Sequence, residues 1–213
     1  MGGLSGKAAS SGASETCSGG KAVLWIHGLG DTGAGWEGAF SSRVEGAEFF
    51  HPTAPRRPVS CNGGARSTSW FDIRSIPVSL AEPENPKDID VTVEQIHGML
   101  ADIEKKGIPS DQIILGGFSQ GGTVSLLAGL QYPRKLAGVV SISGWAANRN
   151  DVAGWLGPVA REVPVLMCCG DGDPVVGFDL TKKSAELLKD VLGDSFEAMY
   201  PRRGMHQPTR EEM

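Results

Sequence analysis

One seven-residue stretch, GGFSQGG at residues 116–122, limits most strongly what this chain can fold into. Apolar runs flank it on both sides, at residues 113–115 and 123–128. A flexible linker would not have hydrophobic segments at both ends, whereas a tight turn from a strand into a helix would. Residues 117–121 read G-x-S-x-G, and side chains at the two glycine positions would collide in such a turn. The pattern predicts that Ser119 is a nucleophile held at the carboxyl edge of a sheet.

The rest of the chain alternates between strand and helix signals. Expected strands cover 22–26, 49–50, 113–116, 139–143, 163–169 and 196–200, and expected helices cover 36–44, 88–106, 120–130 and 179–192. The strands are continuous apolar runs, which is typical of parallel strands buried on both faces. Residues 52–87 are rich in Pro, Ser, Gly and Arg, and we expect a long functional loop there. The sequence therefore predicts an α/β fold, with a mostly parallel central sheet flanked by helices on both faces.

Length and composition favour a single globular domain. The chain has 213 residues, 40% of them hydrophobic, and we expect one domain over residues 21–213. Residues 1–20 are rich in Gly, Ser and Ala and lack the apolar segment of a secretory signal, so we expect a disordered tail. The formal net charge of −5 excludes the broad basic surface that nucleic-acid binding needs.

The cysteines indicate neither a disulfide framework nor a metal site. Cys168 and Cys169 are adjacent, which makes a poor disulfide pair, and with Cys17 and Cys61 they give no zinc-binding spacing. We therefore expect buried, reduced thiols in a cytoplasmic protein, without a bound metal. No stretch approaches the length of a membrane-spanning helix.

A nucleophilic serine needs a base, and the base needs an orienting acid. When the serine lies at a strand-to-helix turn of this kind, the chain order is serine, acid, histidine. Among His27, His51, His97 and His206, only the last follows Ser119 in the chain. The acid should follow the strand at 163–169, where Asp171 and Asp173 are both available. One of them can face His206 while the other ties down the turn through its backbone amides.

A second glycine-rich loop, residues 28–33, allows two interpretations. It reads G-x-G-x-x-G after an expected strand, which is the dinucleotide-binding pattern of an oxidoreductase, with Glu45 or Glu48 at a distance suited to a ribose. The other interpretation is an oxyanion hole, in which Leu29 and Gln120 each supply a backbone N–H. The second interpretation is favoured, because the first leaves the serine turn, the acid and the base unexplained.

Four motifs in order carry a family resemblance. They are HGLGDTG at 27–33, SWFD at 69–72, GFSQGG at 117–122 and GDGDP at 170–174. Over residues 21–213 the chain resembles the acyl-protein thioesterase and lysophospholipase-like carboxylesterase family. The resemblance implies the α/β-hydrolase fold, no cofactor, and hydrolysis of acyl thioesters on S-acylated proteins, or of lysophospholipids and simple esters.

The matching positions also imply roles for individual residues. The implied catalytic triad is Ser119, Asp173 and His206, so the resemblance selects Asp173 over Asp171. The expected oxyanion donors are Leu29 and Gln120. The expected substrate-binding residues are Trp70, Ile76, Leu80, Trp145 and Val175. Ile76 and Leu80 are apolar residues within the long loop, and we hypothesise that residues 74–86 form a lid over an acyl chain.

The chain also departs from the family pattern. It ends at Met213, where the family continues into a C-terminal helix that covers the sheet, and residues 200–206 are one residue longer than the family spacing. An incompletely covered sheet would leave apolar surface for a homodimer contact, and the acyl substrates are compatible with transient contact at a membrane surface. A catalytically weak protein that only binds acyl chains is the alternative from another functional class.

Overall fold

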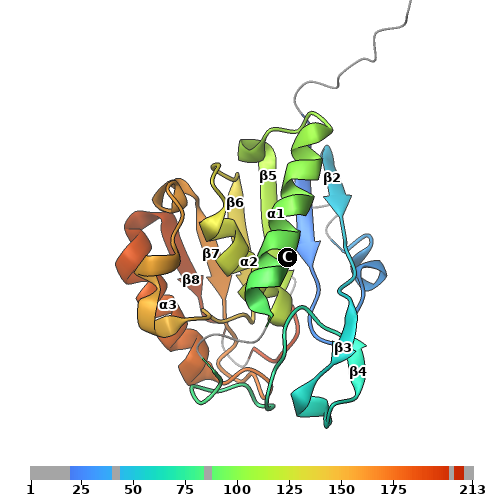
Figure 1. Cartoon of the computed structure of the whole chain (residues 1–213). Coiled ribbons are helices and arrows are strands. Elements are labelled where there is room, and N and C mark those ends of the chain that lie inside the picture. The colour runs from blue at the N-terminus through green and yellow to red at the C-terminus, as the bar shows by residue number, and fades with distance from the viewer. Residues whose placement is uncertain (1–19, 40–43, 84–87, 202–203, 209–213) are drawn as a thin grey trace, which may run out of the picture.

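A parallel sheet of six strands forms the centre of the computed structural model, which describes residues 20–39, 44–83, 88–201 and 204–208 (Figure 1). Its strand order is β2-β1-β5-β6-β7-β8, and every neighbouring pair is parallel. The strands are β1 (Lys21–Ile26), β2 (Ala47–Phe50), β5 (Ile113–Phe118), β6 (Gly138–Ile142), β7 (Val165–Cys168) and β8 (Phe196–Met199). This arrangement confirms the predicted mostly parallel sheet, and each strand lies at or within two residues of its expected range.

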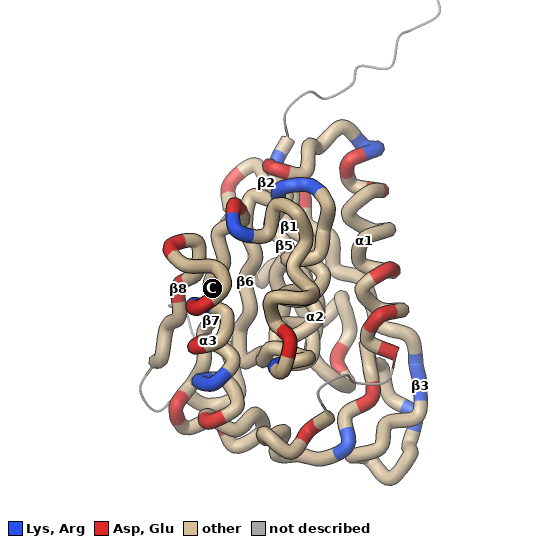
Figure 2. The backbone as a smooth tube through the Cα atoms, turned by 60° about the vertical axis from the view of Figure 1, so that its left-hand side comes forward, with Lys and Arg blue, Asp and Glu red and all other residues tan. Residues whose placement is uncertain are grey.

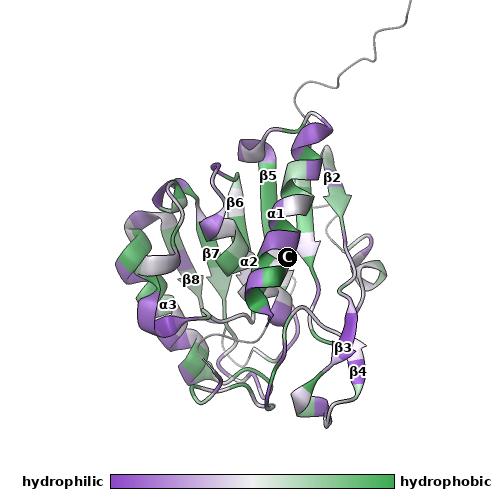
Figure 3. Ribbon diagram, in the orientation of Figure 1, coloured by the Kyte–Doolittle hydropathy of each residue, from purple (hydrophilic) through white to green (hydrophobic). Residues whose placement is uncertain are grey.

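In the described residues, three α-helices pack against the sheet through one continuous core. They are α1 (Ile89–Lys105), α2 (Gln120–Gln131) and α3 (Phe178–Leu192). Apolar residues of all three helices join one cluster with residues from one face of the strands, including Leu24, Leu115 and Val165. Hydrophobic colour accordingly runs along much of the central strands in Figure 3. The burial of this face fixes the strand register, because a one-residue shift would turn every apolar side chain to the other face.

The opposite face of the sheet carries a smaller cluster. It consists of Trp25, Trp36, Ile142 and Cys168, with partly buried apolar residues around them. Trp36 ends the 3₁₀ turn η1 (Gly33–Trp36) and packs against Trp25 with ring centroids 5.2 Å apart. Within the described ranges the α-helices thus cover one face rather than both. Part of the expected helix 36–44 lies outside the described residues, and at 36–39 the chain makes turns, with Gly38 at φ 81°.

The long loop after β2 contains structure that the sequence did not predict. A short antiparallel hairpin joins β3 (Arg56–Pro58) to β4 (Arg66–Thr68). Its strands have three residues each and carry arginines instead of an apolar pattern, so periodicity gave no strand signal; Figure 2 shows the basic residues along β3. Further along, Val78 forms an isolated parallel bridge with Val176.

The parallel arrangement brings several loops to one edge. The carboxyl ends of β1, β5, β7 and β8 all open on the same edge of the sheet, and residues 27–33, 119, 170–177 and 204–208 follow them. Each helix in the described part of the chain is too short or too polar to span a lipid bilayer.

Candidate active site

Ser119 lies at a strained turn between β5 and α2. Its backbone has φ 55° and ψ −120°, a conformation that residues with a side chain rarely adopt. Two hydrogen bonds hold it there. The N–H of Ser119 donates to the carbonyl of Ile142 at 2.7 Å, and the N–H of Thr123 donates to the carbonyl of Ser119 at 3.1 Å. The turn therefore has the geometry of a nucleophile elbow.

The two glycines of the G-x-S-x-G pattern are required by close backbone contacts. A Cβ atom on Gly117 would lie 2.4 Å from the carbonyl oxygen of Gly121. A Cβ atom on Gly121 would lie 2.0 Å from the carbonyl oxygen of Ile26, on the neighbouring strand β1. The sequence pattern predicted a collision between two side chains. The structure shows instead that each added Cβ atom would collide with backbone atoms.

His206 and Asp173 form a directed pair. The Nδ1 atom of His206 lies 2.7 Å from Oδ2 of Asp173, and the two side chains are 15% and 2% exposed. The other carboxylate oxygen, Oδ1, accepts the N–H groups of Val175 at 2.8 Å and Val176 at 2.9 Å. Asp173 therefore performs both tasks that the sequence had divided between two aspartates, since it faces the histidine and also ties down the turn.

Opposing effects act on the pKa of Asp173. Burial raises the pKa of its carboxyl group, whereas the hydrogen bonds from His206, Val176 and Val175 lower it, and the net pKa lies below the ordinary value. The carboxylate is thus charged at neutral pH and accepts the hydrogen bond of Nδ1–H. That hydrogen bond leaves Nε2 of His206 as the nitrogen able to take a proton.

Ser119 and His206 line one cavity of about 260 Å³. The other lining residues are Gly28, Leu29, Asp31, Ile73, Ile76, Val78, Phe118 and Val175. The cavity thus joins five residues that the sequence had singled out: Ser119, His206, Leu29, Ile76 and Val175. Asp173 stands behind the histidine, and Phe118 packs on the His206 ring with centroids 4.8 Å apart.

Three expected substrate-binding residues lie elsewhere. Trp70 is 1% exposed, and its indole N–H donates to the carbonyl of His27 at 2.9 Å. Trp145 is fully buried and meets the ring of Phe71 edge to face. Leu80 is 53% exposed and lines a separate hollow beside the start of α3. The two tryptophans are therefore part of the core beneath the site and do not line the cavity.

The glycine-rich loop after β1 lies directly against the elbow. A Cβ atom on Gly28 would stand 3.3 Å from Cβ of Ser119. Leu29 faces the cavity, and the N–H of Gly30 donates to the carbonyl of Thr68 at 2.9 Å. On the other side, Gln120 is the first residue of α2, so its N–H has no acceptor within the helix and the helix dipole adds partial positive charge there.

His27 holds the backbone at the start of the glycine-rich loop, a role that the sequence analysis did not assign to it. It is fully buried; its Nδ1 donates to the carbonyl of Gly28 at 2.7 Å, and its Nε2 accepts the N–H of Ala54 at 3.0 Å. Burial lowers its pKa, which favours the neutral ring that these two hydrogen bonds need. A histidine that directly follows a buried strand and precedes the glycine loop was the available signal.

The structure does not favour the dinucleotide interpretation. The loop 28–33 leads into the four-residue 3₁₀ turn η1, so the described residues place no α-helix N-terminus there that could receive a pyrophosphate. Glu48 is on β2 with its carboxylate 3.5 Å from Nζ of Lys106. Among the described residues, no cluster of three or more His, Cys, Asp or Glu could hold a metal ion.

A serine elbow, a histidine–carboxylate pair and a backbone loop at the carboxyl edge of a parallel sheet define the serine hydrolases of the α/β-hydrolase fold. The family model of phospholipases and carboxylesterases matches residues 13–213. The chain belongs to this family, and it is a serine hydrolase of esters.

Individual relatives agree with this assignment. An acyl-protein thioesterase 1 of Gibberella zeae is 37% identical over 201 residues, covering 90% of this chain and 85% of the relative. A probable carboxylesterase of Oryza sativa subsp. japonica is 38% identical, covering 90% of this chain and 73% of the relative. Among solved structures, SOBER1 of Arabidopsis thaliana superposes with a TM-score of 0.84 at 29% identity, covering 90% of this chain and 93% of that one. Acyl-protein thioesterase 2 of Zea mays has a TM-score of 0.79 at 26% identity, covering 92% and 90%.

Proposed function

We propose that Ser119, His206 and Asp173 are the catalytic triad of an enzyme that hydrolyses acyl thioesters and carboxylic esters. One observation carries the proposal. The Asp173 carboxylate accepts a 2.7 Å hydrogen bond from His206, and that histidine lines the same cavity as a serine held at φ 55°. A serine is a weak nucleophile on its own, and a neighbouring imidazole oriented by a buried carboxylate activates it.

The proposed reaction proceeds in two halves. Oγ of Ser119 adds to the acyl carbonyl carbon while its proton passes to Nε2 of His206. The carbonyl oxygen becomes an oxyanion, which the N–H groups of Leu29 and Gln120 stabilise. His206 then protonates the departing thiolate or alkoxide, leaving an acyl-serine. Water attacks this ester with the same histidine as base, and the carboxylic acid departs.

Thioesters on S-acylated proteins and lysophospholipid esters are the proposed substrates. Relatives named acyl-protein thioesterase and carboxylesterase support them, as do the apolar residues of the cavity, among them Ile73, Ile76 and Val175. At about 260 Å³ the cavity is near the lower end of the usual range for small-molecule sites, about 300–1,000 Å³. We infer that it encloses the acyl chain close to the carbonyl, while the distal part runs along the surface.

The loop at residues 74–86 is the proposed lid, and two sets of contacts limit its movement. Val78 exchanges backbone hydrogen bonds with Val175 and Gly177, at 2.7 and 2.8 Å. The guanidinium of Arg149 donates to the carbonyls of Leu80 and Glu82. The proposed lid is therefore attached to the loop that carries Asp173, with Ile76 at the cavity; residues 84–86 lie outside the described ranges.

Further properties follow as proposals. We propose one domain over residues 21–213, since one core cluster draws on all three α-helices and on strands from β1 to β8. Transient contact with a membrane surface fits acyl substrates, and exposed apolar side chains such as Met199 and Tyr200 fit a homodimer contact. The free thiol of Cys61 supports a cytoplasmic location.

A fluorophosphonate probe tests the mechanism directly. The probe forms a covalent bond only with an activated serine, so the wild-type chain should be labelled and Ser119→Ala should not. Ser125→Ala changes another buried serine, on α2, and is the matched control that should keep labelling. Equal labelling of wild type and Ser119→Ala would disprove the proposed nucleophile, and an unlabelled wild type would favour an acyl-binding protein without turnover. Hydrolysis of a palmitoyl-thioester peptide and of a lysophospholipid, measured in parallel, then ranks the substrates.

A further inference from the structure

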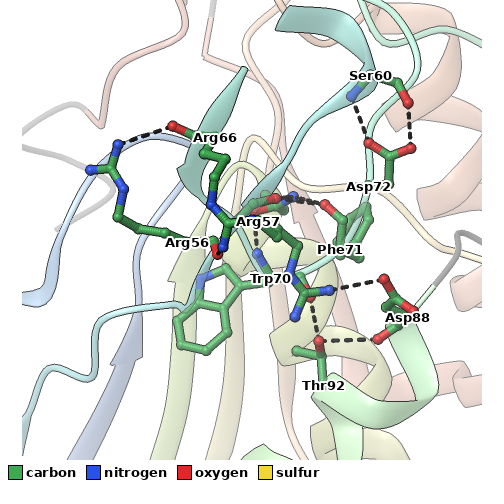
Figure 4. A network of polar contacts seen from close by, with 11 residues as sticks. Arg56, Arg57, Ser60, Arg66, Trp70, Phe71, Asp72, Asp88 and Thr92 are labelled. Atoms are coloured by element: carbon green, nitrogen blue, oxygen red, sulfur yellow. Dashed lines mark hydrogen bonds and ion pairs between the residues drawn. The ribbon is translucent and has the colours of Figure 1, made fainter. Parts of the chain in front are cut away.

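Trp70 uses all of its polar groups to connect segments far apart in the chain. Its indole N–H donates to the carbonyl of His27 at 2.9 Å, and its backbone N–H donates to Oε1 of Gln120 at 2.9 Å. Its carbonyl accepts the hydroxyl of Thr92 at the start of α1. Figure 4 shows Trp70 with Phe71 and Thr92 in this network. Trp70 thus contacts the residue that precedes the glycine-rich loop and the residue that follows the nucleophile.

The side chain of Gln120 serves only this connection. It is fully buried, and its Nε2 donates to the carbonyl of Phe71 at 2.7 Å and to Oγ of Ser69 at 3.0 Å. Both side-chain polar atoms of Gln120 are therefore bound to residues 69–71. The residue is not among those that line the cavity, so its side chain is not poised to touch substrate.

We propose that Trp70, acting with the Gln120 side chain, is a positioning residue that sets the distance between the two halves of the oxyanion hole. The inference rests on the proposed function, in which Leu29 and Gln120 supply the two N–H groups. The loop at 28–30 contains two glycines, one of them at φ 82°, so its own backbone preferences hold it weakly. The Trp70 indole ties the carbonyl of His27, directly before this loop, to the same segment that fixes Gln120.

The geometry explains why a buried tryptophan matters for rate. An oxyanion hole stabilises the transition state only when both donors point at the place where the negative charge develops. A displacement of about 1 Å at such a site can cost about a hundredfold in rate. Losing the indole hydrogen bond should therefore lower kcat and leave ground-state binding unchanged.

The primary test is Trp70→Phe, with Trp155→Phe as the matched control. Trp155 is a partly buried tryptophan of the 3₁₀ turn η5 (Ala153–Trp155), and its indole N–H has no acceptor in the described part of the chain. We expect Trp70→Phe to lower kcat about 10- to 100-fold at unchanged KM, because it loosens one donor rather than removing it. Trp155→Phe should change neither value.

Two inhibitors of equal chain length separate positioning from binding. An alkyl trifluoromethyl ketone forms a tetrahedral adduct: Ser119 Oγ bonds to the ketone carbon, its proton passes to His206, and the ketone oxygen becomes an oxyanion. The corresponding unfluorinated methyl ketone reports mainly the ground-state binding of the chain. In Trp70→Phe the Ki of the first should rise by the factor by which kcat falls, while the Ki of the second and the pH profile stay unchanged.

Other results would overturn the inference. An unchanged kcat, or equal rises in both Ki values, would mean that Trp70 does not position the hole. If Trp70→Phe does not fold, 3-benzothienylalanine at position 70 replaces only the indole N–H by sulfur and the same criteria apply. Combining Trp70→Phe with Gln120→Met should cost less than the product of the single losses, since both act through one element. Ser119→Ala separates failure of the proposed triad from failure of the proposed role of Trp70. Retained fluorophosphonate labelling of Ser119→Ala would reject the triad itself.

Discussion

Replacing Asp173 by asparagine separates the catalytic task of this residue from its structural one. Oδ1 of the carboxylate binds the N–H groups of Val175 and Val176, whereas Oδ2 binds Nδ1 of His206. Asparagine has one oxygen, which can keep both backbone contacts, and its NH₂ group must then face the histidine. Because two donors cannot share a hydrogen bond, the ring proton moves to Nε2, and His206 can no longer accept the proton of Ser119.

The expected size of the effect follows from this tautomer change. A wrong histidine tautomer in a triad costs about 10⁴-fold in kcat, which is about 5.5 kcal/mol at about 1.36 kcal/mol per tenfold. The cost in folding stability should be smaller, about 1.5–3 kcal/mol for one hydrogen bond to a charged group. The assay is the hydrolysis of p-nitrophenyl butyrate, with urea unfolding followed by circular dichroism. Asp171→Asn makes the same chemical change two residues away and should keep kcat within about twofold of wild type, because Asp173 is the carboxylate bound to His206.

The contribution of Asp173 to folding stability depends on pH with a definite sign. The pKa of Asp173 is lower in the folded chain than in the unfolded chain, so its contribution to stability is complete above the unfolded pKa of about 3.9 and is lost as pH falls through the folded-state pKa. The stability difference between wild type and Asp173→Asn should therefore be constant near neutral pH and disappear in acid. An Asp173→Asn enzyme within tenfold of wild-type kcat would refute the assignment of the acid, as would a loss caused by Asp171→Asn instead.

Two further predictions concern the elbow and the cavity. Gly121→Ala would bring a Cβ atom to 2.0 Å from the carbonyl of Ile26, so we expect the variant not to fold, which thermal denaturation would show as a missing unfolding transition. The control is Gly98→Ala on α1, where an added Cβ atom meets nothing within 4 Å. This change should be neutral or should stabilise the fold by up to about 1 kcal/mol. Ile76→Ser should raise KM for long-chain esters about fivefold and leave KM for acetate esters unchanged. The side chain is half exposed, so covering it with an acyl chain should contribute about half of its full burial energy to binding, roughly 1 kcal/mol. Leu80 lies outside the cavity, so Leu80→Ser is the control for this change. Equal effects of Ile76→Ser on both chain lengths would argue against a lid.

The fold was largely predictable because its signals are local. Each buried parallel strand is a continuous apolar run, and such runs are visible without knowledge of the partner strands. The hairpin β3–β4 was missed because Arg56–Pro58 and Arg66–Thr68 are too short and too polar to carry a period. The coverage of both faces by α-helices was also not found in the described residues, since the segment around Trp36 forms a 3₁₀ turn between glycines.

The candidate site was likewise predictable from the sequence only in part. The G-x-S-x-G spacing and the order of Ser119 and His206 follow from one-dimensional constraints, because a strained turn needs glycines and only one histidine lies downstream. Which aspartate faces the histidine depends on the direction of side chains in a loop, so the residues alone left Asp171 and Asp173 open. The burial of Trp70 and Trp145 beneath the cavity likewise depends on contacts with segments distant in the chain.

The sequence by itself determined the kinds of chemistry available: a serine at a glycine-lined turn, a downstream histidine, and two aspartates after a buried strand. These features are encoded in short segments, whose conformations depend on neighbouring residues. Only the tertiary structure decided that Asp173 holds both the histidine and its own loop, that Ile76 and Val175 reach the cavity while Leu80 does not, and that Trp70 bridges two loops. Those outcomes arise from packing and hydrogen bonds between residues distant in the chain, such as the 50 positions that separate Trp70 from Gln120, and no local pattern specifies them.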